Sequence, residues 1–347
     1  MHNKPNRNFP QPFERMAGED QNNMKIAVLL ANMGGPDSLQ SVEEYLFNIF
    51  RDPDMIDIPL RGKLRDRFAR WLARKRAPES RKIYNQIGGK SPLVQISRHQ
   101  AEILEKNLNA EQKANFKVFP AMRYWHPFLH EVWQTITQND FRQVIILSMY
   151  PFYSSTTSGS IIQMVERLKQ RMDFDEREII VIDRFGNHPA FIDVMVGQIK
   201  RALSEHPKTH FEDLLLSAHS IPMRRIKNGD PYQKEIEQAV SAIRRALPDH
   251  IRVHHSYQSK IGPVKWLEPA TSDKIDELAH AGVKNLLLYP LGFVADNSET
   301  VYEMDILYKT VALEKGIEQF HRIESPNING AFINVLKDII LEKLNGR

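Results

Sequence analysis

Short apolar runs alternate along this chain with longer segments in which apolar residues recur at helical spacing. The short runs are typical of buried strands, and the longer segments are typical of amphipathic helices. The expected strands are Lys25–Ala31, Lys117–Met122, Gln143–Met149, Ile179–Ile182, Leu214–Ser217, Arg252–Tyr257, Asn285–Tyr289 and Gln319–Ile323. The expected helices include Ile161–Met172, Phe191–Leu203, Tyr232–Leu247 and Thr271–Ala281. This alternation predicts an α/β fold with two parallel sheets of about four strands each, flanked by helices.

Length and composition are those of a globular protein with two domains. The chain has 347 residues, 41% of them hydrophobic and 26% charged. We expect a disordered tail over 1–23, one domain over 24–185 and a second over 186–347, whose last helix could pack back on the first domain. The tail lacks the apolar core of a signal peptide, and no run is long enough to span a membrane, so we expect a cytoplasmic protein.

Charge and cysteine content exclude several kinds of site. The 47 basic and 43 acidic residues are too balanced to indicate nucleic-acid binding. The chain has no cysteine, which excludes disulfides, cysteine-held iron–sulfur clusters and thiolate zinc sites. Any metal would have to be held by His, Asp, Glu or weaker ligands.

Residues 60–76 combine many basic side chains with an apolar stripe. The stripe consists of Leu64, Phe68, Trp71 and Leu72. Such a helix commonly lies on an anionic membrane surface or covers an apolar, acid-bearing ligand. A helix packed on the core with a solvated basic face fits the pattern equally well. The turn at Gly88–Pro92 follows and could bind an anion.

An apolar run that ends at Ser217 delivers His219 into a polar turn. Open α/β sheets bind their ligands beyond the carboxyl ends of strands, and a neutral imidazole there can act as a base or as a metal ligand. In a chain with 13 histidines, a loop histidine bonded to backbone is the more ordinary interpretation. The residue becomes a stronger candidate only if other chemical groups join it.

Acidic residues gather after another expected strand, in Ala295–Asp305. Glu299 and Glu303 are four residues apart and share one helix face, and Asp296 precedes them. Two unpaired carboxylates on one face repel, which is tolerated where a cation or a proton is handled. An acidic first turn that complements the helix dipole also explains the pattern. With His219, these groups would suit Fe²⁺, Mn²⁺, Co²⁺ or Zn²⁺ held transiently.

Two loops of the chain resemble each other. Leu147–Ile161 and Leu287–Val301 both run from a strand through Tyr-Pro into a polar loop and then a helix whose free N–H groups could hold an anion. This short repeat suggests duplicated halves that face each other across a cleft.

Aromatic side chains punctuate the same loops. They are Tyr84, Tyr124, Trp125, Tyr150, Phe152, Tyr153, Trp266 and Phe293. Such a set fits a wide, flat ligand better than a compact polar one, although ordinary packing accounts for several of them. Arg123 follows an expected strand and could pair with a ligand carboxylate or with an internal acid.

Taken in order from Leu29 to about Asn327, the motifs resemble those of the ferrochelatases, which insert ferrous iron into a porphyrin in haem biosynthesis. The matching stretches include NMGGP, YNQIGGKSPL, AMRYWHP, YPFYSSTTSGS, SAHSIP, GDPY, QSKIGP and FVADNSETVYEMD. The resemblance implies two similar Rossmann-like domains with the porphyrin in the cleft between them. It also implies Fe²⁺ as a substrate and no permanently bound cofactor.

The resemblance also implies roles for particular residues. His219 and Glu299 match the family's active-site histidine and acid, and both are candidate metal ligands; Asp296 and Glu303 match acids thought to guide protons or metal. Pocket positions are matched by Met33, Tyr84, Arg123, Tyr124, Trp266 and Phe293, propionate positions by Arg76 and Ser91, and the lip over the pocket by 60–92. One departure is Asn297, which stands where many members have His or Cys and cannot accept a proton near neutral pH.

We therefore expect insertion of Fe²⁺ into protoporphyrin IX, forming protohaem and releasing two protons, through distortion of the ring and removal of pyrrole protons by His219. Coproporphyrin III as the substrate, a porphyrin or haem carrier without activity, and a chelatase for a more carboxylate-rich ring are the alternatives. Peripheral membrane contact through 60–76 is a further expectation. The side of iron entry and the oligomeric state are left open by the sequence.

Overall fold

The computed structural model describes residues 24–346 except 57, 112–113, 172–177 and 261–263. The expected tail over 1–23 lies outside the described residues. So do Met172, at the end of one expected helix, and 261–263 of the QSKIGP motif.

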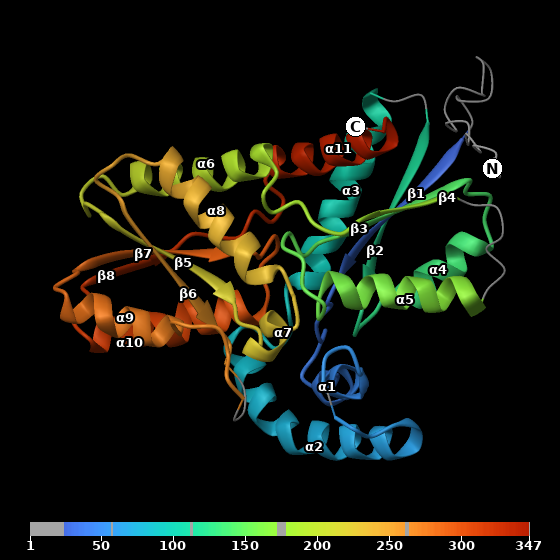
Figure 1. Cartoon of the computed structure of the whole chain (residues 1–347), viewed down its shortest axis with the longest axis horizontal. Coiled ribbons are helices and arrows are strands. Elements are labelled where there is room, and N and C mark those ends of the chain that lie inside the picture. The colour runs from blue at the N-terminus through green and yellow to red at the C-terminus, as the bar shows by residue number, and fades with distance from the viewer. Residues whose placement is uncertain (1–23, 57, 112–113, 172–177, 261–263, 347) are drawn as a thin grey trace, which may run out of the picture.

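Two parallel four-stranded sheets organise the fold (Figure 1). The first has the order β2-β1-β3-β4 and consists of β1 (Lys25–Asn32), β2 (Asn115–Met122), β3 (Gln143–Ser148) and β4 (Glu178–Ile182). The second has the order β6-β5-β7-β8 and consists of β5 (Asp213–His219), β6 (Arg252–Gln258), β7 (Asn285–Leu291) and β8 (Gln319–Arg322). The predicted α/β fold with two four-stranded parallel sheets is confirmed, and the two strand orders are equivalent.

Helices cover both faces of each sheet, which explains why the central strands read as nearly continuous apolar runs. α4 (Leu129–Thr137) and α5 (Ser158–Arg171) cover one face of the first sheet. α9 (Thr271–His280), the π-helix η3 (Glu299–Tyr308) and α10 (Lys309–Glu314) cover one face of the second. The opposite faces pack on α3 (Leu93–Glu111), α6 (Pro189–Glu205), α8 (Tyr232–Ala246) and α11 (Gly330–Leu344).

One apolar core extends across both halves of the chain. Leu30 of the first sheet and Leu216 of the second belong to it, together with Phe191 of α6 and Phe332 of α11. The last helix, α11, lies against both α3 and α6 (Figure 1), and Asn107 on α3 donates a hydrogen bond to Asn334 on α11 at 3.2 Å. The domain boundary between 185 and 186 therefore stays a prediction.

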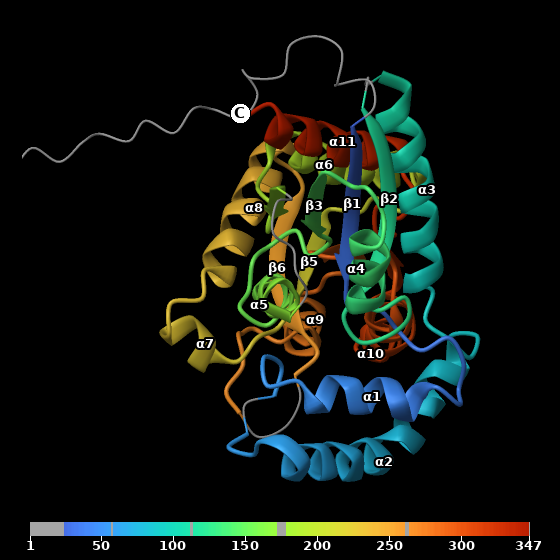
Figure 2. The same cartoon turned by 90° about the vertical axis from the view of Figure 1, so that its right-hand side faces the viewer.

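α1 (Val42–Arg51) and α2 (Gly62–Gln86) pack side by side outside the sheet layers (Figure 2). α2 continues ten residues beyond the expected end at Arg76 and contains Pro78. The proline lacks the N–H that would bond one turn back and its ring crowds the carbonyl there, yet the helix continues through it to Gln86.

The face of α2 that is buried differs from the one its large apolar residues suggested. Ala69 and Ala73 are fully buried and pack with Phe47 of α1, whereas Leu64 and Trp71 are 64% and 56% exposed. Arg65 is also buried, and its guanidinium donates to backbone carbonyls of the 51–60 segment, including those of Arg51 and Asp52 at 2.7 and 2.9 Å. Leu64 and Trp71 are thus not packed on the core, whereas Phe68 and Leu72 of the same stripe are half-buried.

Candidate active site

β5 ends at His219, beyond the buried apolar residues that hold the strand in the sheet. Its neighbour in the sheet is Gln258 at the end of β6. The Tyr232 hydroxyl donates to the backbone carbonyl of His219 at 2.9 Å, which fixes the last residue of the strand. The His219 side chain is 39% exposed, so solvent reaches an imidazole that is attached to a buried strand.

His219 and Glu299 form a pair across the end of the second sheet. His219 Nδ1 lies 2.8 Å from Glu299 Oε2. Desolvation alone would lower the pKa of His219, but the charge and the hydrogen bond of Glu299 outweigh it and raise that pKa above 6.5. Desolvation alone would raise the pKa of Glu299, but His219 and neighbouring donors lower it. An ionised Glu299 only accepts, so Nδ1–H donates and Nε2 is the nitrogen that Glu299 leaves available.

A second carboxylate lies behind this pair. Glu303 accepts from Ser259 Oγ at 2.8 and 2.9 Å and from the Tyr308 hydroxyl at 3.2 Å. The same Ser259 hydroxyl lies 3.2 Å from Glu299, and Gln258 Nε2 lies 3.4 Å from it. Desolvation and the charge of Glu299 raise the pKa of Glu303 to about 7. Glu303 can therefore hold or release a proton near neutral pH.

Both glutamates belong to η3, which begins at Glu299. A π-helix is wider than an α-helix, and such turns occur frequently at functional sites. Glu299 and Glu303 lie on the face of η3 that meets the ends of β5 and β6, as their bonds to His219 and Ser259 require.

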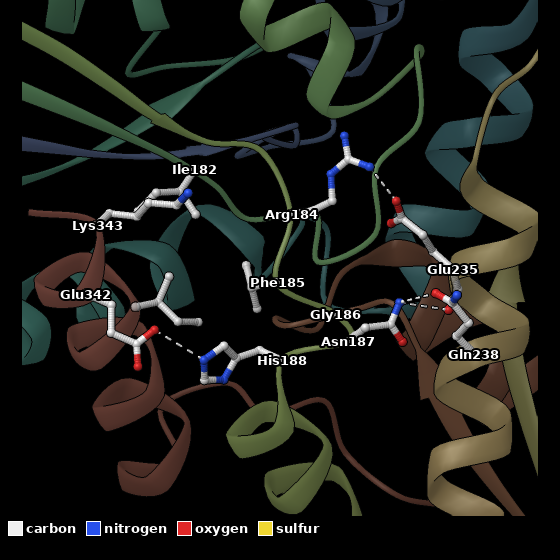
Figure 3. A pocket seen from close by; sticks show the side chains of 11 residues that line it. Ile182, Arg184, Phe185, Gly186, Asn187, His188, Glu235, Gln238, Glu342 and Lys343 are labelled. Atoms are coloured by element: carbon white, nitrogen blue, oxygen red, sulfur yellow. Dashed lines mark hydrogen bonds and ion pairs between the residues drawn. The ribbon is translucent and has the colours of Figure 1, made fainter. Parts of the chain in front are cut away.

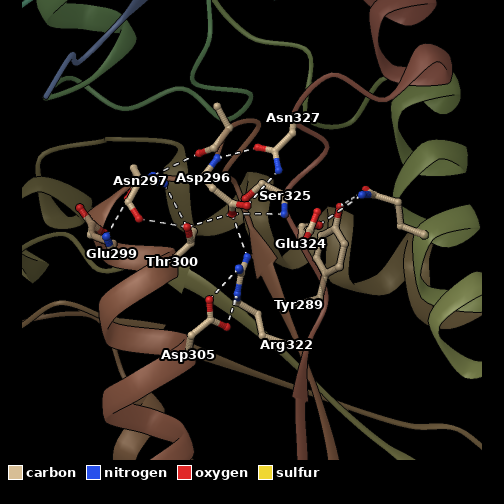
Figure 4. A network of polar contacts seen from close by, with 12 residues as sticks. Tyr289, Asp296, Asn297, Glu299, Thr300, Asp305, Arg322, Glu324, Ser325 and Asn327 are labelled. Atoms are coloured by element: carbon tan, nitrogen blue, oxygen red, sulfur yellow. Dashed lines mark hydrogen bonds and ion pairs between the residues drawn. The ribbon is translucent and has the colours of Figure 1, made fainter. Parts of the chain in front are cut away.

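Asp296 is buried in a polar network on the other side of this loop (Figure 4). Its carboxylate accepts from Arg322 and Thr300 at 2.8 and 2.9 Å through one oxygen and from Asn327 at 2.9 Å through the other. Arg322 also binds Asp305 with two nitrogens. None of these partners is His219, and they favour a positioning role for Asp296, because the network anchors the segment that leads into η3.

Asn297 also has local partners. Its side-chain oxygen accepts from the backbone N–H of Glu299 at 2.8 Å, and its amide donates to the carbonyl of Ala295 at 3.3 Å. The residue therefore forms an Asx turn that leads into η3, a conformation that asparagine favours. The departure from His or Cys leaves the local backbone geometry supported.

Tyrosines of the first half approach the same glutamate. The hydroxyl of Tyr84, near the end of α2, donates to Ser298 Oγ at 3.3 Å. Desolvation raises the pKa of Tyr84 to about 12, and the charge of Glu299 adds to it. Burial and the charge of Glu299 also raise the pKa of Tyr45 and of Tyr150. Neutral phenols from α1, α2 and the loop after β3 thus lie near Glu299 of the second half.

A family model described as Ferrochelatase matches residues 25–344. The ferrochelatase of Aquifex aeolicus is 38% identical over 317 residues, covering 91% of this chain and 99% of that protein. The ferrochelatase of Geotalea uraniireducens is 40% identical over 316 residues, covering 91% and 97%. The chain belongs to the ferrochelatase family. It is therefore a lyase of haem biosynthesis whose reaction is insertion of metal into a porphyrin.

Solved structures support the fold of this ferrochelatase. SirB from Bacillus subtilis, determined with Fe³⁺, superposes with a TM-score of 0.54 at 10% identity and covers 92% of this chain and 95% of that chain. At this level of identity the likeness concerns the arrangement of sheets and helices.

Three of the expected pocket residues of the enzyme lie together beside α1. Met33 packs on a cluster formed by Tyr45, Tyr124 and Trp125. The Tyr124 hydroxyl and Arg123 both donate to Asp52, at 2.7 and 2.6 Å. Arg123 therefore pairs with an internal acid, the second of the two partners that its position suggested, and its contact with a ligand carboxylate stays a prediction.

The other expected substrate positions are spread around the site. Arg76 is exposed on α2 and binds Glu79 at 3.2 Å. Ser91 is buried against the loop after β1, so closely that a Cβ on Gly35 would lie 2.5 Å from it. Trp266 pairs with Pro222, just after the His219 turn, and Phe293 packs partly buried near η3. Arg76 and Ser91 have no described contact with His219 or Glu299.

No preformed cage for a metal is present among the described residues, since no three His, Asp or Glu side chains converge closely enough to hold an ion. The His219–Glu299 pair offers two donors, which suits a metal that must be surrendered. A cavity of about 370 Å³ lies elsewhere, between the 182–188 segment, α8 and α11 (Figure 3). It contains none of the expected site residues.

Sequence reasoning missed Ser259, Gln258 and Tyr308 as members of the site. Each bonds Glu299 or Glu303 through its side chain. The available signal was the polar QS pair directly after an expected strand, at the same sheet edge as His219.

Proposed function

We propose that this enzyme inserts Fe²⁺ into protoporphyrin IX, with His219 as the base that removes the pyrrole protons. The observation that carries the proposal is the 2.8 Å contact between His219 Nδ1 and Glu299 on a solvent-accessible imidazole. Glu299 raises the pKa of His219 and so strengthens it as a proton acceptor, because a proton taken by Nε2 creates a cation that the carboxylate stabilises.

The reaction balances as free-base porphyrin plus Fe²⁺ giving haem plus two protons. The two N–H protons leave the ring as the metal enters, while the metal keeps its charge. We assign the first acceptance to His219 and the passage toward solvent to Glu299 and Glu303. Glu303, with a pKa of about 7, is matched to taking up and releasing a proton at neutral pH.

Distortion of the macrocycle is the second element of the proposal. A flat free-base ring directs its lone pairs inward, and bending exposes them to the metal. Met33 beside its aromatic cluster and Trp266 beside the His219 turn lie on opposite halves of the chain. We propose that these side chains and Phe293 press on the ring from both sides.

Protoporphyrin is favoured over coproporphyrin by the lip residues. Leu64 and Trp71 present apolar surface to solvent on a basic helix, and this surface suits vinyl groups better than additional propionates. The same surface, with Lys75 stacked 5.4 Å from the Trp71 ring, suits an anionic membrane headgroup layer. We therefore propose peripheral contact with the inner face of the membrane. No described helix is both long and apolar enough to cross a bilayer.

An anaerobic assay tests the proposal. Protein, Fe²⁺ or Zn²⁺, and either protoporphyrin IX or coproporphyrin III are mixed while the Soret band is followed. We expect turnover with both metals and a higher kcat/KM for protoporphyrin. A higher kcat/KM for coproporphyrin would reverse the substrate assignment, and tight porphyrin binding without turnover would indicate a carrier. In liposome flotation with anionic vesicles, Trp71→Ser should reduce the bound fraction, and absence of binding by the parent protein would contradict membrane contact.

A further inference from the structure

Ser259 lies directly beyond β6, where the chain leaves the second sheet beside His219. Its hydroxyl lies 2.8 and 2.9 Å from the two carboxylate oxygens of Glu303 and 3.2 Å from Glu299. Among the described residues, it is the side chain that hydrogen-bonds both glutamates of η3. The two acids are thus joined through a residue that belongs to a different element.

The backbone of Ser259 has an uncommon conformation that serves this contact. Its φ of 64° lies in the left-handed region, which few residues other than glycine adopt. Such a conformation persists where surrounding contacts determine it, and here the side-chain bonds to η3 are among those contacts. Glycine would relieve the backbone cost but would remove the hydroxyl.

The contacts of the Ser259 hydroxyl oppose a repulsion between the two glutamates of η3. Glu299 and Glu303 are one turn apart on η3, and like charges at that spacing push each other away. Without the Ser259 hydroxyl between them, each carboxylate could rotate toward water. Rotation of Glu299 would break its 2.8 Å contact with His219. The orientation of the reacting imidazole therefore depends on what holds Glu299.

We propose that Ser259 is a positioning residue, which holds the Glu299 carboxylate against His219 and the Glu303 carboxylate behind it. The inference deepens the proposed function, since the consequence of correct positioning is metal insertion. It differs from a general structural role, because it predicts loss of turnover without loss of porphyrin affinity.

Three variants of Ser259 separate the effect of its hydroxyl from the effect of its backbone conformation. Ser259→Ala removes the hydroxyl, Ser259→Gly removes it and relieves the left-handed backbone, and Ser259→Asn tolerates that backbone and restores a donor. For Ala and Gly we expect kcat to fall about tenfold to a hundredfold, with the KM for porphyrin within about twofold of the parent value. Asn should recover a large part of kcat. Ser272→Ala, an exposed hydroxyl beside Asp273 on α9, is the matched control and should keep the parent kcat.

Parent-like kcat in both the Ala and the Gly variant would overturn the proposal, as would recovery by Gly, which would assign the effect to the backbone. A rise in the KM for porphyrin as large as the fall in kcat, together with a lowered Tm, would indicate a structural role for Ser259. That result would also overturn the proposal.

A second measurement is independent of turnover and separates failure of this proposal from failure of the proposed function. In the parent protein, the Nδ1–H proton of His219 bonded to Glu299 should give a strongly downfield imidazole resonance. We expect that resonance to weaken in Ser259→Ala and to persist in Ser272→Ala. Its persistence in Ser259→Ala would overturn the proposal even if the parent protein inserted no metal.

Discussion

β1 and β5 occupy the same place in their sheets, yet the side chains of their last residues make different contacts. Asn32 ends β1 opposite Met122 of β2, and His219 ends β5 opposite Gln258 of β6. The Asn32 side chain accepts from the next backbone N–H at 2.8 Å, whereas the His219 imidazole reaches Glu299, 80 residues further along the chain. Equivalent topology brings both residues to a sheet edge, and only the second carries an ionisable side chain, whose pKa Glu299 raises.

The loops after β3 and β7 extend the comparison. In the first half, the hydroxyls of Ser154 and Ser155 donate to Asp230 of the second half at 2.9 and 2.8 Å, so this loop ties the halves together. In the second half, the loop enters η3 and presents Glu299. The shared Tyr-Pro does not align in space, because Tyr150 follows the last paired residue Ser148 and Tyr289 precedes Leu291. Duplicated topology thus supplies positions, and each half uses them differently.

The most direct test of this difference is to replace the last residue of β5 with asparagine, the residue that ends β1. In His219→Asn, metal insertion should fall about 10²- to 10⁴-fold, because the amide cannot take a pyrrole proton. The dissociation constant for porphyrin, measured by fluorescence quenching, should stay within about twofold of the parent value. His99→Ala, an exposed histidine on α3, serves as the control. Turnover of the variant near the parent rate would refute the assignment of the base.

The anchor of η3 provides the next test. Asp296→Ala should lower the free energy of unfolding in urea by about 3 kcal/mol, because buried Arg322 loses one of its two acids. Asp305→Asn should cost less, since Asp305 is 37% exposed. If folded Asp296→Ala loses turnover as completely as His219→Asn while its stability is unchanged, Asp296 relays protons, and the positioning role is wrong.

Loss of the hydrogen bonds between Asp230 and the loop after β3 should have a smaller effect on stability. Asp230→Ala removes the acceptor of three hydrogen bonds from Ser154 and Ser155 and should lower stability by about 1–3 kcal/mol. A double-mutant cycle with Ser155→Ala measures how much of this loss belongs to that pair. Additive losses would mean that the two side chains do not interact in solution.

A carboxylate at the opposite, amino-terminal end of β5 gives the smallest effect, on stability against pH. Burial would raise the pKa of Asp213, but hydrogen bonds from Arg252 and His254 lower it below 3.8. A lowered folded-state pKa means that the stabilisation is complete above the unfolded value and is lost as pH falls through the folded one. The Tm of the parent protein should therefore fall below about pH 4 more steeply than that of Asp213→Asn. Parallel curves would contradict the lowered pKa.

Much of the fold could be predicted because strand formation here depends on local pattern. Leu214 to Ser217 are apolar or small because both faces of β5 are covered, and the same holds for Ala27 to Ala31 of β1. The pairing of His219 with Glu299 could be anticipated as well, since His219 ends β5, Glu299 follows β7, and the carboxyl ends of these paired strands meet at one edge.

What the sequence could not determine depends on partners that are distant along the chain. Asp296 looked like a member of the acidic cluster, but Arg322 on β8 holds it elsewhere. The pattern of Leu64 and Trp71 fitted a buried stripe and an exposed one equally well, and the structure shows that α1 meets the alanine face of α2 instead. The sequence did not distinguish Ser259 from other serines, whereas in the structure the end of β6 places its hydroxyl against Glu303 of η3.

The sequence by itself therefore determined the two sheets, because hydrophobic periodicity is a local property, and it determined the family and the His219–Glu299 pair, because motif order is read directly along the chain. Only the tertiary structure decided which acids face the imidazole and which face an arginine. A carboxylate has the same chemistry in either place, and its role follows from the groups that packing brings within hydrogen-bond distance.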